Sequence, residues 1–107
     1  MIRLLIANIW CLTLCLNCAV GGEMSKHNYI PPDGYVPNKE TAIKIALAVW
    51  SPIYGVEKIQ SEAPYRAELI GETWLVEGSQ SEDRVGGVAV IEIDKNTGRI
   101  FRVSHGR

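Results

Sequence analysis

The sequence predicts an α+β domain in which one main N-terminal helix packs against an antiparallel sheet of about four strands in meander order. Three observations support this fold class. An apolar helical pattern runs from Lys39 to Trp50, and two pairs of alternating strands follow it at 64–78 and 87–104. Short turn sequences join the strands within each pair, which favours hairpins over helical crossovers.

Residues 1–21 match the pattern of a secretory signal peptide. The uncharged run Leu4–Val20 follows Arg3, and small residues end it. A basic start, an apolar centre and a small-residue end are typical of a leader that is removed on export. We therefore expect cleavage at Gly21 or Gly22 and a mature chain in the periplasm.

Three alternatives to export with cleavage remain open. An uncleaved leader would anchor the chain, although the apolar run barely reaches the ~20 residues that a spanning helix needs. Lipidation at Cys15 or Cys18 would make a lipoprotein, and translation from Met24 would leave the chain in the cytoplasm. All 3 cysteines lie in this segment, so a chain that begins at Gly22 has no disulfide, thiolate metal site or thiol nucleophile.

Residues 22–37 form a polar and proline-rich lead before the domain at 38–107. Its prolines and a glycine exclude a helix. We expect this segment to lie extended over the domain, with Tyr29, Tyr35 and Val36 as packing contacts.

The main helix is predicted to begin after Asn38, whose side chain can accept a hydrogen bond from the first turn. Its apolar stripe continues to Trp50, and Pro52 is expected to end it. The following segment, 51–61, is either a short helix around 56–60 or a loop, and we predict a loop with one helical turn.

Four strands are expected after this segment, at 64–70, 73–78, 87–94 and 99–104. A polar loop joins the second strand to the third. Alternation on the last two strands predicts that one set of side chains faces the helix, namely Ala89, Ile91, Ile93, Phe101 and Val103. The opposite, exposed face then carries the charged residues Glu68, Glu77, Glu92 and Arg102.

The charge pattern favours a protein partner over nucleic acid. From residue 22 onward 10 basic residues stand against 12 acidic ones, a net charge of −2. The stretch 57–94 is acidic, whereas 95–107 has 4 basic residues and no acidic one. Such polarity suits a complementary protein surface, although solvated charges on exposed faces would give the same pattern.

The sequence contains no pattern that indicates catalysis or a cofactor. His27 and His105 lie near the ends of the chain, where chains fray, and neither has the spacing of a metal site. Trp50 and Trp74 are expected in the core. We therefore predict a non-enzymatic chain without metal or cofactor.

Three stretches resemble a known family: "GYVPNKETAIKIALAVWSPIYG", "APYRAELIGETWLVEG" and "GGVAVIEIDKNTGRIFRVSHG". Together they resemble bacterial immunity proteins of nuclear-transport-factor-2-like (NTF2-like) fold, found beside Rhs and other polymorphic toxins. The resemblance implies a non-enzymatic protein that binds a cognate toxin domain and blocks it. The last stretch alone, with its turn Asp94–Gly98, also resembles the PepSY module, which implies a periplasmic interaction or protease-inhibiting unit. A small-ligand or enzyme domain is a further alternative.

If the acidic middle of the chain binds the toxin, its contacts would be electrostatic. The candidate binding residues are Glu68, Glu77 and Glu92 on the exposed sheet face, Arg102 beside them, and Glu82 and Asp83 in the polar loop. Acidic groups that oppose a basic partner surface speed encounter and fix orientation.

Overall fold

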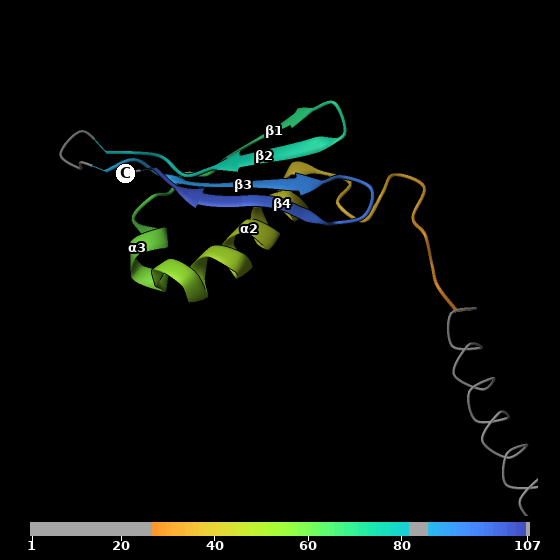
Figure 1. The fold of residues 1–107 in the computed structure, drawn as a ribbon, viewed down its shortest axis with the longest axis horizontal. Helices are drawn as coiled ribbons and strands as arrows, with labels where there is room; N and C mark the ends of the chain where they lie inside the picture. Colours follow the sequence, from red (N-terminus) through yellow and green to blue (C-terminus); the bar gives the residue numbers. More distant parts are fainter. Residues whose placement is uncertain (1–26, 82–85, 107) are drawn as a thin grey trace, which may run out of the picture.

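A computed structural model describes residues 27–81 and 86–106 of the chain (Figure 1). The helices are α2 (Lys39–Tyr54) and α3 (Val56–Gln60), and the strands are β1 (Arg66–Ile70), β2 (Thr73–Glu77), β3 (Ala89–Asp94) and β4 (Ile100–His105). The strands form one antiparallel sheet in the order β1-β2-β3-β4, which confirms the predicted α+β meander. The predicted leader, with Cys15, Cys18, Gly21 and Gly22, and the loop residues Glu82 and Asp83 lie outside the described residues.

Helix α2 begins as predicted but ends later. The Asn38 side chain accepts a hydrogen bond from the Thr41 amide at 2.9 Å, which caps the first turn. The prediction that Pro52 ends the helix is wrong, because α2 continues to Tyr54. Pro52 lies in the last turn of the helix. Because proline has no amide hydrogen, the carbonyl of Ala48 has no hydrogen-bond donor four residues later. Both residues are exposed, so water can bind that carbonyl. Among the described residues, no helix has the length and apolarity needed to cross a bilayer.

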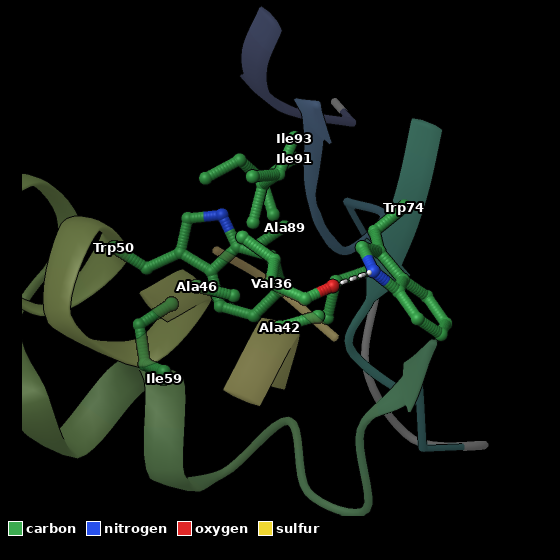
Figure 2. Close-up of a cluster of buried hydrophobic side chains, with 10 residues drawn as sticks. Val36, Ala42, Ala46, Trp50, Ile59, Trp74, Ala89, Ile91 and Ile93 are labelled. Carbon is green, nitrogen blue, oxygen red and sulfur yellow. Dashed lines mark hydrogen bonds between the residues drawn. The ribbon is translucent and has the colours of Figure 1, made fainter. Parts of the chain in front are cut away.

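One core lies between α2 and the sheet. Helix α2 contacts β1, β2 and β3 and covers a single face of the sheet (Figure 1). The fully or nearly fully buried apolar side chains come from the lead, both helices and the sheet (Figure 2); they are Val36, Ala42, Ala46, Trp50, Ile59, Trp74, Val76, Ala89, Ile91 and Ile93. The small side chains of Ala42 and Ala46 let α2 pack close to the sheet. Burial of each large aliphatic side chain contributes about 1.5–3 kcal/mol to stability.

The lead is attached to the sheet through backbone hydrogen bonds around Val36. The Val36 amide donates to the Lys95 carbonyl at 3.0 Å, and the Val36 carbonyl accepts a hydrogen bond from the Trp74 indole at 2.8 Å (Figure 2). Val36 therefore packs as expected. Tyr29 is 73% exposed and Tyr35 is 43% exposed, so neither is a core contact.

The expected position of Phe101 against the helix is wrong. β3 and β4 pair Glu92 with Arg102 but Ile93 with Ile100, so a bulge leaves Phe101 without a partner on β3. Such an extra residue interrupts the alternation, so Ile100 takes the position opposite Ile93 that Phe101 was expected to occupy. Phe101 is 49% exposed, with the Arg99 guanidinium 5.5 Å from its ring centre. Val103, by contrast, packs against the core as predicted.

Candidate functional site

The face of the sheet opposite α2 is not covered by any helix or strand of the described residues (Figure 1). We call it the open face. Directly paired residues in an antiparallel sheet lie on the same side, so the strand register assigns its members. They are Arg66, Glu68, Ile70, Thr73, Leu75, Glu77, Val90, Glu92, Asp94, Arg102 and Ser104.

Two cross-strand ion pairs occupy this face. Arg66 Nη2 lies 2.7 Å from Glu77 Oε1, and Arg102 Nη2 lies 2.9 Å from Glu92 Oε2. Exposed pairs of this kind contribute only about 0–1 kcal/mol to stability, but they cancel charge locally. Among the described residues Glu68 has no ion-pair partner. The open face therefore offers less free negative charge than the sequence suggested.

Between these charges the open face is apolar and hollowed. A shallow depression of about 260 Å³ is lined by Ile70, Thr73, Leu75 and Glu92. Ile70 is 55% exposed, which is a large exposure for an apolar side chain on a strand. An apolar centre with a polar rim is the usual anatomy of a protein–protein interface.

Asp94 closes one end of the open face by holding the turn between β3 and β4. Its carboxylate accepts hydrogen bonds from the Thr97 amide at 3.1 Å and the Thr97 hydroxyl at 2.6 Å. The Thr97 hydroxyl, more than any other group, lowers the pKa of Asp94 below its usual value. Asp94 therefore serves the turn rather than a partner.

A buried hydrogen-bonded pair of polar side chains on the helix side of the sheet was missed by the sequence analysis. Glu62 is fully buried, and its carboxylate accepts a hydrogen bond from the Ala89 amide at 2.8 Å. The other carboxylate oxygen lies 2.7 Å from Nε2 of His105, so His105 does not fray but joins the end of β4 to the segment after α3. A methyl group on Gly78 would come within 2.7 Å of the Glu62 carboxylate, so that position requires glycine.

The contacts of Glu62 and His105 indicate a structural role. The second ring nitrogen of His105, Nδ1, lies 3.1 Å from the Gly106 carbonyl, so neither nitrogen is directed at a free hydroxyl. The neighbouring Tyr65 hydroxyl donates to the Ile59 carbonyl at 2.8 Å. A catalytic dyad needs a nucleophile within reach of its base, and none of the described residues supplies one here. Within the same residues no group of three or more potential ligands could hold a metal ion.

Comparison with known proteins identifies the family of this fold. Residues 41–107 match the family described as NTF2 fold immunity protein, Imm-NTF2-2. The chain belongs to this family of immunity proteins. It is also 38% identical over 73 residues to the uncharacterized protein YhhH of Escherichia coli strain K12, a match that covers 67% of this chain and 58% of that relative. The chain thus spans less than two thirds of YhhH, and no solved structure matches it.

Membership of the family agrees with the resemblance to immunity proteins that the sequence shows. It also favours this interpretation over the PepSY-like alternative. For this immunity protein, the structure places Glu68, Glu77, Glu92 and Arg102 together on the open face, as predicted. What the sequence analysis did not anticipate is that three of these four side chains are engaged in ion pairs.

Proposed function

We propose that this immunity protein neutralises one cognate toxin domain by stoichiometric, non-catalytic binding through its open face. The observation that carries the proposal is the depression lined by Ile70 and Leu75 on a sheet face that no described element covers. Apolar groups left exposed in this way gain free energy when a partner covers them. The surrounding ion pairs supply the polar rim.

The roles of the charged residues follow from their pairing. Glu77 and Glu92 already have arginine partners, so we expect them to hold the rim in shape rather than to attract the toxin. Glu68 is free to form an ion pair with a basic group of the toxin, which would raise the association rate. Binding strength would come mainly from the apolar centre, since central anchor residues dominate most interfaces.

We further propose that this binding takes place in the periplasm, after removal of residues 1–21, and that the toxin is of the Rhs or another polymorphic class. The apolar leader supports the first point, and the resemblance of the sequence to immunity proteins of such systems supports the second.

The test is purification of the tagged full chain from its native cells, with mass spectrometry of the co-eluting proteins and of the chain's own N-terminus. A toxin domain recovered at one copy per chain, and cells that survive that toxin only when the chain is present, would support the proposal. Neutralisation by far less than one chain per toxin would contradict non-catalytic binding.

A pair of substitutions tests the surface. Leu75→Arg introduces a charge between Glu68 and Glu92, at a half-buried position that lies on the open face and not in the core. We expect it to abolish toxin capture and protection. Gln60→Arg introduces the same charge at an exposed position of α3, on the other side of the sheet, and should change neither. Equal behaviour of the two variants would remove the open face as the binding surface.

A further inference from the structure

The two edges of the sheet differ in how well they could pair with another strand. At β4 the bulge at Phe101 interrupts the regular ladder, and bulges protect an edge from pairing. β1 pairs regularly with β2 from Arg66 to Ile70 and contains no bulge, proline or lysine. Figure 1 shows β1 at the outer side of the sheet, with no described element beyond it. β1 is thus an intact template for strand pairing.

The backbone of β1 presents hydrogen-bonding groups to this free edge. A two-residue turn, 71–72, connects β1 to β2, so the closing pair of Ile70 and Thr73 exchanges hydrogen bonds. The pattern alternates along the strand, which leaves the amides and carbonyls of Ala67 and Leu69 directed away from β2. These groups are the ones that a further strand would bind.

We propose that two copies of the chain associate by antiparallel pairing of their β1 strands, with Ala67 opposite Ala67 on the two-fold axis. The charges of β1 select this register. It places Arg66 opposite the partner's Glu68, and Glu68 opposite the partner's Arg66. Each guanidinium, already bound to Glu77 of its own chain, then also faces a second carboxylate across the seam on the open face. A two-fold axis at residue 66 or 68 would instead oppose like charges.

The apolar side of β1 is complementary in the same register. Leu69 is 41% exposed and lies on the side that faces α2, because it pairs with buried Trp74. In the proposed dimer it lies opposite the partner's Tyr65. A hollow of about 360 Å³ extends around the β1 edge. Ile43, Tyr65 and Ala67 line its helix side, and Arg66, Glu68, Leu75 and Glu77 line its open-face side. The small side chain of Ala67 leaves space on the helix side, and the partner's Leu69 would enter that part of the hollow.

Sedimentation of the purified full chain in mild detergent, without toxin, measures the association. We expect a concentration-dependent dimer. Ala67→Pro removes only an amide that is directed away from β2, a position where edge strands tolerate proline, and should give a folded monomer. A chain that stays monomeric at all concentrations, or an Ala67→Pro variant that still dimerises, would overturn the proposal.

A charge exchange tests the register. Glu68→Arg opposes arginines at both cross-strand positions and should weaken the dimer about tenfold. Adding Arg66→Glu restores the two opposite-charge pairs and should restore association. Glu57→Arg makes the same change on α3, away from β1, and should have no effect. Absence of rescue by the double variant would contradict the register.

Disulfide formation provides a second test, in a chain with serine at positions 11, 15 and 18. Ala67→Cys should cross-link two copies, because directly opposed residues lie about 5.5 Å apart between Cα atoms, within disulfide range. Leu69→Cys should not, since its two copies lie roughly 13 Å apart along the strands. Equal cross-linking of both variants would refute this pairing.

The toxin is the other candidate for the β1 edge. If the purified chain is monomeric and the Ala67→Pro variant loses toxin capture, the β1 edge binds a strand of the toxin, and pairing with a second copy is excluded.

Discussion

Removal of the Glu62 carboxylate is expected to destabilise the domain more than any surface change. Glu62→Ala takes away the acceptor of the Ala89 amide and the partner of His105, and it leaves both groups beside a void. Each buried donor left without an acceptor costs about 1–3 kcal/mol, and the Ala89 amide and the His105 ring both lose theirs, so we expect a loss of about 3 kcal/mol or more with the void included. With about 4–8 °C of Tm per kcal/mol for a domain of this size, Tm should fall by about 12 °C or more.

Thermal and urea unfolding of the full chain, followed by circular dichroism, measures this loss. Glu62→Gln keeps an oxygen for the Ala89 amide and should lose clearly less stability than Glu62→Ala. His105→Ala should also destabilise, because it leaves a buried carboxylate with a single donor. The double variant Glu62→Ala/His105→Ala should lose less than the sum of the two. Additivity within about 0.5 kcal/mol, or a loss below about 1 kcal/mol for Glu62→Ala, would refute the proposed coupling.

Three further predictions concern stability. Trp74→Phe removes the indole hydrogen bond to Val36 and should cost about 1–2 kcal/mol in urea unfolding, with faster proteolysis before residue 38. Asn38→Ala removes the cap of α2 and should cost about 1 kcal/mol, whereas Asn38→Ser should restore most of it. Burial, followed by the nearby Glu62 carboxylate, raises the pKa of Tyr65 above 10.0. The folded state therefore favours the neutral phenol, and the contribution of Tyr65 to the free energy of unfolding is complete below that pH and is lost as the pH rises further. The stability advantage of the native chain over Tyr65→Phe should therefore shrink above about pH 10, and an unchanged difference would contradict this assignment.

Local patterns were sufficient to predict most of the fold. Alternation in 87–94 indicated which side chains face the helix, and Ala89, Ile91 and Ile93 are indeed fully buried. The two-residue turn at 71–72 also predicts the pairing of β1 with β2. A two-residue hairpin fixes the register, so it already places Arg66 opposite Glu77, the pair that neutralises part of the open face.

The features that were missed depend on distant parts of the chain. Glu62 and His105 are 43 residues apart, and no local pattern distinguishes Glu62 from the exposed acidic residues around it. Its burial follows from the close packing of Gly78 and from the Ala89 amide that its side chain satisfies. The bulge at Phe101 likewise arises from the pairing of two strands and cannot be read from the alternation of one.

The bulge in β4 also bears on how large an assembly this sheet can form. A sheet with two regular edges could add copies at both sides without end, as fibrils do. In the proposed dimer the two β1 edges are consumed by each other, and each outer boundary of the joined sheet is a β4 strand interrupted at Phe101. Growth therefore stops at two copies. A displaced residue in one strand thus makes the difference between a closed pair and an open polymer.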